Sequence, residues 1–261
     1  MKMMQTAALA ATLALAPAAA PLTASAAEVD KQAVLKTYAD IAHAGYEDSL
    51  ITAQALQRAV DGLIANPSEE ALAAAREAWV AARVPYQQTE VYRFGNAVVD
   101  DWEGKVNAWP LDEGLIDYVD EGAYGSESDE NPIYTANVIA NEKLNVNGEM
   151  VDASTIDKTL IAEVLHEAEE VEANVATGYH AIEFMLWGQD LNGTGPGAGD
   201  RPWTDFSTSE CTNGHCDRRG QYLASATNLL VADLDEMVAN WEEGGAARKE
   251  VTTDSTAGLS A

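Results

Sequence analysis

The chain contains one strongly apolar stretch that also carries ionisable side chains: Gly178-Tyr179-His180-Ala181-Ile182-Glu183-Phe184-Met185-Leu186-Trp187-Gly188-Gln189-Asp190. Its aliphatic and aromatic content predicts a buried segment around which the rest of the chain packs. His180 and Glu183 are three residues apart, so on a helix they emerge on nearly the same face. Burying them costs free energy unless they hydrogen-bond to each other or share a partner such as a metal ion. The spacing alone leaves both interpretations open.

Apolar residues recur every three or four positions on both sides of this stretch, which is the spacing of amphipathic helices. We expect helices over residues 28–64, from Asn66 toward Phe94, over 156–169 and over 217–243. Pro85 lies inside the second helix and should kink or split it. No long stretch alternates apolar and polar residues with the period of two that is typical of β-strands. The sequence therefore predicts an all-α, up-and-down bundle of about four main helices.

Residues 95–142 form a long connection rich in Asp, Gly and Asn, with a short helical patch over 111–118. A connection of this length in a compact domain is usually functional or strapped across the bundle. Asp112 and Glu113 are reserve candidates for metal ligands, although carboxylates in a loop are more often simply solvated.

The second predicted helix carries a polar and aromatic stripe: Trp79, Arg83, Tyr86, Glu90 and Arg93 recur at intervals of three or four and share one face. One interpretation is a solvated face with a few aromatic rings. The other is that Glu90 points into the bundle and supplies a further ligand beside the His–Glu pair.

The N-terminal residues are typical of a secretory signal peptide over residues 1–26. Lys2 precedes a short apolar run over residues 6–16, and Ala24-Ser25-Ala26 forms a small-residue cleavage site. The apolar run is too short for a membrane span, and no later run is long enough for one. We therefore expect export to the periplasm or cell surface, a helical domain over residues 27–245 and a disordered tail over 246–261.

The net charge limits which partners are expected, and the two cysteines predict a local cross-link. The chain has 15 Lys and Arg against 43 Asp and Glu, a formal net charge of −28, which disfavours nucleic acid and anionic membranes as partners. Cys211 and Cys216 lie close together in a glycine-containing loop, which in an oxidising compartment favours a local disulfide. A metal clip with His215 is the alternative, but no second pair of cysteines exists to complete a zinc site.

Three motifs together resemble the imelysin-like family, in particular its iron-regulated, IrpA-type members. The first is Gly178-x-His180-x-x-Glu183 with the residues that follow it to Asp190. The other two are the segments from Ala78 to Phe94 and from Asn107 to Glu113. The resemblance covers residues 28–243.

The resemblance implies an exported metal-binding protein that acts in iron uptake, with His180, Glu183 and Glu90 as the ligands. Iron is the expected metal and zinc the alternative. The implied partners are a metal ion or small iron chelate and a membrane-associated uptake partner. Family members of this kind are similar to tandem helical bundles, of which this sequence matches the first. Residues 246–261 would then be a linker to a second bundle.

Two other functions remain open. The family name implies a metallopeptidase, but zinc peptidases place two His ligands and a Glu base on one helix, and Phe184 stands where the inverse motif requires a second His. Alternatively, His180 and Glu183 complete a buried hydrogen-bond network in a non-catalytic interaction module.

Overall fold

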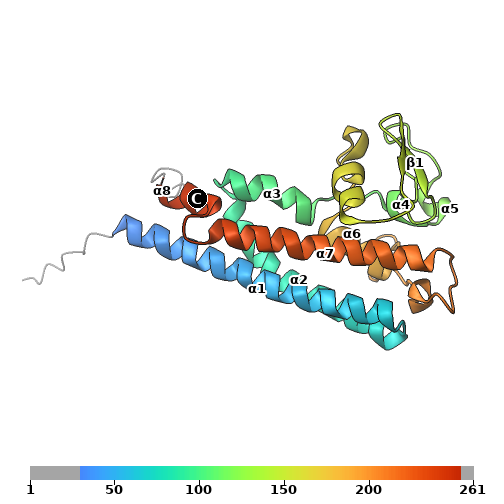
Figure 1. Cartoon of the computed structure of the whole chain (residues 1–261), viewed down its shortest axis with the longest axis horizontal. Helices are drawn as coiled ribbons and strands as arrows, with labels where there is room; N and C mark the ends of the chain where they lie inside the picture. Colours follow the sequence, from blue (N-terminus) through green and yellow to red (C-terminus); the bar gives the residue numbers. More distant parts are fainter. Residues whose placement is uncertain (1–29, 254–261) are drawn as a thin grey trace, which may run out of the picture. The chain divides into compact units, whose positions relative to one another are not determined.

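Three long helices form the frame of the protein. The computed structural model describes residues 30–253, in which α1 (Lys31–Ala65) packs against both α2 (Glu69–Thr89) and α7 (Cys216–Trp241) (Figure 1). The buried side chains of α1 recur every three or four residues, so one face of this helix lies in the core: Leu35, Ala39, Ala42, Tyr46, Ser49, Ala53, Leu56, Val60 and Leu63. The predicted all-α fold is confirmed.

The start and end of α2 differ in detail from the prediction. The helix begins at Glu69 rather than at Asn66, and Ser68 caps it: the Ser68 hydroxyl accepts a hydrogen bond from the Ala71 amide. Pro85 does not split α2, which runs to Thr89 and is followed directly by the 3-10 turn η1 (Glu90–Arg93). Of the two effects expected of Pro85, a kink or a split, the split was therefore wrong.

The connection after α2 contains more regular structure than we predicted. It includes α3 (Ala97–Asn107), with Val99, Trp102 and Val106 buried, and the single-turn helices α4 (Glu113–Ile116) and α5 (Glu121–Tyr124). A small antiparallel hairpin follows, formed by β1 (Lys143–Val146) and β2 (Glu149–Asp152). The helix predicted over 156–169 is replaced by a π-helical turn η2 (Leu160–Leu165) and a 3-10 turn η3 (Ala168–Glu170).

The apolar stretch over residues 178–190 forms α6 (Gly178–Trp187), which contacts α2, α3 and α7. Its first residue must be glycine for two reasons. Gly178 has a φ of +78°, and a Cβ there would lie 2.4 Å from the carbonyl oxygen of Val106 at the end of α3. This close approach fixes the start of α6 against α3.

The C-terminal end also corrects a prediction. Residues 246–253, expected to belong to a disordered tail or linker, form α8 (Ala246–Thr253), with Ala247 and Val251 buried. The Asn96 side chain donates a hydrogen bond to the Ala247 carbonyl at 2.8 Å and anchors α8 to α3. The predicted signal peptide and residues 254–261 lie outside the described residues. No helix within residues 30–253 has the length and apolarity needed to cross a membrane.

Candidate metal site on helix α6

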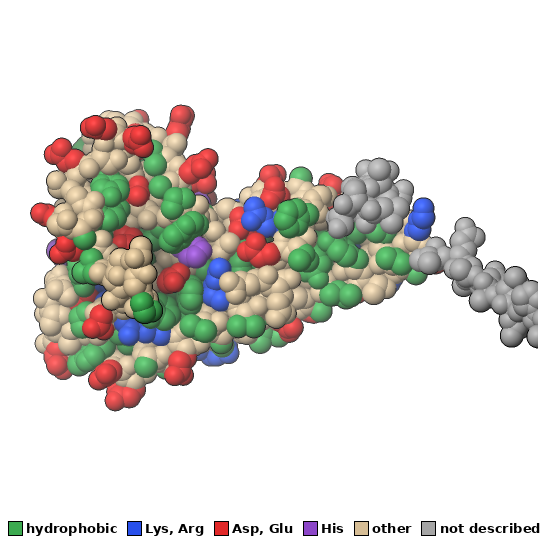
Figure 2. All heavy atoms as spheres, turned by 180° about the vertical axis from the view of Figure 1, so that it is seen from behind, with side chains coloured by type: hydrophobic (Ala, Val, Ile, Leu, Met, Phe, Trp, Pro, Cys, Tyr) green, Lys and Arg blue, Asp and Glu red, His purple; other side chains and the backbone are tan. Residues whose placement is uncertain are grey.

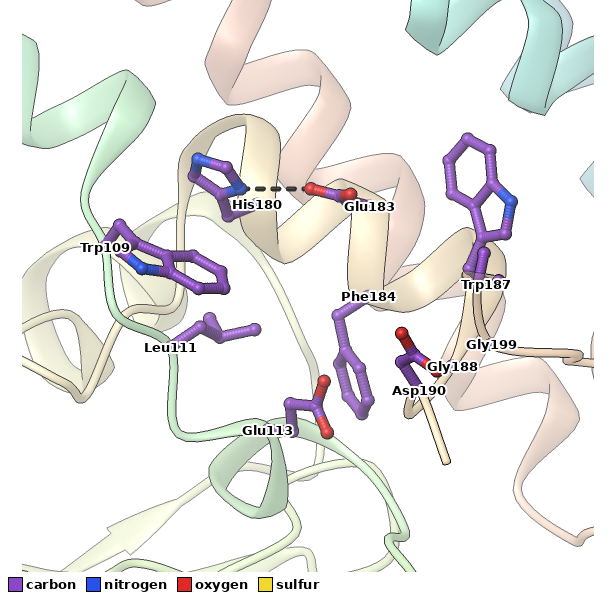
Figure 3. Close-up of a pocket in the computed structure, with 12 residues that line it drawn as sticks. Trp109, Leu111, Glu113, His180, Glu183, Phe184, Trp187, Gly188, Asp190 and Gly199 are labelled. Atoms are coloured by element: carbon purple, nitrogen blue, oxygen red, sulfur yellow. Dashed lines mark hydrogen bonds and ion pairs between the residues drawn. The ribbon is translucent and has the colours of Figure 1, made fainter. Parts of the chain in front are cut away.

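Ionisable side chains from three segments converge on one cavity of about 660 Å³ beside α6. His180 and Glu183 come from the first two turns of α6, Glu113 from the start of α4, and Asp190 from the loop after α6 (Figure 3). The remaining wall is largely aromatic, aliphatic or glycine: Trp109, Leu111, Phe184, Trp187, Gly188, Gly197, Ala198 and Gly199. One imidazole and three carboxylates therefore share a partly apolar site.

His180 and Glu183 interact directly, as their spacing predicted. The distance between His180 Nδ1 and a Glu183 carboxylate oxygen is 3.0 Å. The His180 side chain is 18% exposed and that of Glu183 is 42% exposed, so the pair borders the cavity and is not sealed in the core. The Trp109 ring contacts the imidazole, with the ring centroids 4.9 Å apart.

Glu113 occupies the opposite wall of the cavity. The pKa of its carboxyl group is raised to about 7, mainly by burial; the charge of Arg201 opposes the increase, and the charges of Asp190 and Glu183 add to it. The carboxylates thus lie close enough to repel one another. A bound cation would relieve this repulsion.

Glu90 does not join this site. It begins η1, where one carboxylate oxygen accepts a hydrogen bond from Asn107 Nδ2 at 3.3 Å and the other lies 3.9 Å from Arg93 Nη1. Glu90 does not line the cavity. Across residues 30–253, no group of three or more His, Cys, Asp or Glu side chains is arranged to hold a metal ion. The predicted set of His180, Glu183 and Glu90 is therefore not assembled.

Trp79, Arg83 and Tyr86, the part of the stripe that lies on α2, face α6, so the interpretation as a solvated face was wrong for these three. Glu90 and Arg93 lie in η1 and are 38% and 35% exposed. Trp79 Nε1 donates a hydrogen bond to the Tyr179 carbonyl at 2.9 Å. The Arg83 guanidinium lies over the rings of Tyr86 and Tyr179, with its Cζ 5.3 and 4.9 Å from their centroids. Arg83 also donates a hydrogen bond to Asn107 at 2.6 Å. These contacts fix the first turn of α6 from behind.

The other candidates from the sequence lie elsewhere. The Asp112 carboxylate accepts a hydrogen bond from Asn131 at 2.6 Å and does not line the cavity. Cys211 and Cys216 form a disulfide. Their sulfurs are therefore not available for the metal clip with His215 that was the alternative.

A buried cluster of charges behind the cavity was missed by sequence reasoning. Arg201 Nη1 donates to carboxylate oxygens of Asp117 at 2.6 Å and Asp205 at 3.0 Å. Arg219 forms a bidentate pair with Asp117 at 2.7 and 3.0 Å. Arg201 and Asp205 are four residues apart, but Asp117 and Arg219 lie far from them in the sequence, so local spacing could not reveal the cluster as a whole.

Comparison with known proteins shows the family to which this chain belongs. The imelysin family model matches residues 42–261, and the chain belongs to this family. Iron-regulated protein A of Synechococcus elongatus is 38% identical over 61 residues, which cover 23% of this chain and 17% of that protein. A crystal structure of an iron-regulated protein A precursor from Parabacteroides distasonis matches with a TM-score of 0.52 and 23% identity, over 84% of this chain. The chain spans 47% of the length of that structure, whose likeness shows the shared fold.

The surface is acidic, as the composition predicts. Figure 2 shows acidic side chains spread over one face of the molecule, where Lys and Arg side chains are fewer. The relatives' names refer to regulation by iron, so the family has an iron-related context.

Proposed function

We propose that this chain is an exported iron-binding protein of the periplasm or cell surface that acts in iron uptake, with iron as its cargo. The observation that supports this most directly is the convergence of His180, Glu183, Glu113 and Asp190 on one cavity. The name of its Synechococcus elongatus relative, iron-regulated protein A, supports the choice of metal.

The geometry of the His–Glu pair fits two neighbouring ligands of one metal ion. Metal–nitrogen and metal–oxygen bonds of about 2.1 Å at a right angle place the two ligand atoms about 3.0 Å apart. His180 Nδ1 and the Glu183 oxygen are separated by 3.0 Å. A cation could therefore replace the hydrogen bond between them while their separation stays the same.

The donor set favours iron. One imidazole nitrogen with carboxylate oxygens suits borderline to hard cations, and the cavity offers no thiolate for a soft ion. Glu113 and Asp190 line the same cavity and would complete the coordination through bridging water molecules. Zinc can use the same atoms, so it is the competing ion to test.

The test is metal binding by the mature chain, wild type against His180→Ala. Protein freed of metal with a chelator is titrated with ferrous ion under anaerobic conditions, and bound iron is measured after gel filtration. We expect one iron per wild-type chain and its loss in His180→Ala, with an unchanged far-UV circular dichroism spectrum. The same titration with zinc ranks the two metals.

The chain offers a matched control on α1. His43 Nδ1 lies 3.5 Å from a Glu47 carboxylate oxygen, again as a His–Glu pair on one helix but away from the α6 cavity. His43→Ala should therefore keep its iron. Equal iron binding in wild type and His180→Ala would refute the proposed site.

Export and uptake need separate tests. The signal peptide predicts a mature chain that begins at Ala27, which N-terminal sequencing of the exported protein checks. Deletion of the gene should slow growth when a chelator limits iron, and added iron should restore it. A mature chain that keeps residues 1–26 would contradict the export step.

A further inference from the structure

One edge of the Arg201 guanidinium lacks a partner although the side chain is buried. Its Nη1 is held by Asp117 and Asp205, and the side chain has 0% exposure. Nε and Nη2 have no hydrogen-bond acceptor within the described part of the chain. Leaving buried charged donors unsatisfied is costly, so a ligand that supplies acceptors here gains binding free energy.

The surroundings hold this guanidinium in one orientation. Its Cζ lies 5.0 Å from the centroid of the Tyr118 ring and 5.5 Å from that of Phe184. Asp117, which binds Nη1, is itself fixed by the bidentate pair with Arg219. The Nε–Nη2 edge is therefore a preorganised fork of two parallel donors, a geometry that matches a carboxylate.

This edge lies next to the proposed iron site. A Cβ on Gly188 would lie 3.7 Å from Arg201 Nε and 3.8 Å from Nη2, so only glycine backbone faces the edge there. Gly188 lines the α6 cavity and also a second cavity of about 480 Å³, which Arg201 lines too. Both nitrogens are covered in this conformation, so a ligand oxygen reaches them only if the Gly188 backbone moves aside.

We propose that the Arg201 edge binds a carboxylate group of an iron chelate, so that the cargo arrives as a polycarboxylate complex of the metal. This inference rests on the proposed function and names the form of its substrate. A free polycarboxylate fits less well, because Asp120 and Asp200 also line the second cavity, and Glu113 and Glu183 line the first. The metal's positive charge offsets the repulsion from these acidic side chains.

The experiment compares two probes, ferrous ion alone and ferric citrate, on the full mature chain. In Arg201→Lys the positive charge remains but the fork is lost. We expect ferrous ion to bind wild type and variant equally, and ferric citrate to bind the variant roughly tenfold more weakly, or worse. Unchanged affinity for ferric citrate in Arg201→Lys, with ferrous binding intact, overturns this inference alone. Wild type that binds neither probe overturns the proposed function itself.

A second measurement avoids the variant, which could fail to fold. The Nε–H signal of Arg201 in the wild-type nitrogen–proton NMR spectrum is followed during titration with gallium citrate, a diamagnetic substitute for ferric citrate. We expect this signal to shift and that of Arg218 to stay, because Arg218 is buried with its donors on backbone carbonyls such as Ile139 and Ala153. An unmoved Arg201 signal, or an equal shift with inorganic phosphate alone, overturns the inference.

Discussion

Asp233 should destabilise the fold at neutral pH, and its replacement by Asn should reveal by how much. This residue of α7 is 8% exposed and lines a small cavity of about 310 Å³ together with Lys105, Glu163 and His166. Within residues 30–253, no hydrogen bond or ion pair to its carboxylate is found. Burial raises its pKa from 3.8 to about 6, Lys105 and Lys158 oppose this increase, and Glu236 adds to it.

The sign of the effect follows from proton linkage. Between pH 3.8 and about 6 the folded chain binds more protons at Asp233 than the unfolded chain does. Stability is therefore lost as pH rises through this window, and the loss is complete above it. The full difference in pKa corresponds to about 3 kcal/mol. Because the carboxylate lines a cavity and is not sealed in the core, we expect solvent screening to reduce this to about 1–2 kcal/mol.

Urea denaturation of wild type and Asp233→Asn at pH 7.5 and pH 5 measures this directly. We expect the variant to be more stable at pH 7.5 by about 1–2 kcal/mol and by about half as much at pH 5. Asp235→Asn is the matched control: Asp235 is exposed on the same helix, and its replacement should change stability by less than about 0.5 kcal/mol. The reasoning is refuted if Asp233→Asn is no more stable than wild type at pH 7.5, or if its gain in free energy of unfolding is the same at both pH values.

Two further predictions concern stability and are checked by the same urea titrations. Gly178→Ala should lose about 3 kcal/mol or more, because it combines an unfavourable positive φ with a clash against the α3 carbonyl. Gly104→Ala, in a helix interior with open space around the added methyl group, should instead gain about 0.5–1 kcal/mol, and similar losses for the two variants would contradict the argument. Replacing both Cys211 and Cys216 by Ser should cost only about 2 kcal/mol, because their disulfide closes a short loop. A much larger loss would show that the bridge has a role beyond closing that loop.

The long helices could be predicted because the apolar periodicity that defines them lies within each helix's own sequence. The apolar periodicity of α1 and α7 extends over many turns, so a few misplaced boundaries do not change the assignment. α3 was missed because only Val99, Trp102 and Val106 are buried in it, among acidic and small residues. The π-helical turn over 160–165 was also missed, since tertiary packing rather than local preference selects it.

The residues of the candidate site likewise differ in whether local sequence spacing predicts their position. His180 and Glu183 are one helical turn apart, so their meeting could be predicted from spacing alone. Glu113 reaches the same cavity from the start of α4, far away in the sequence, and the sequence alone supported it only as a reserve candidate. Asp205 is only four residues from Arg201, but Asp117 and the two aromatic rings around the guanidinium come from other segments, so the environment of Arg201 could not be anticipated from local spacing.

Glu90 does not line the cavity, but a series of contacts connects its carboxylate to the first turn of α6. α2 changes to a 3-10 turn at Glu90, which redirects the side chain toward the end of α3. There Glu90 accepts a hydrogen bond from the Asn107 amide, whose oxygen accepts one from Arg83 at 2.6 Å. Arg83 in turn lies over the Tyr179 ring, directly before His180. A carboxylate at position 90 therefore contributes to orienting the first turn of α6, and the imidazole on that turn borders the proposed iron site.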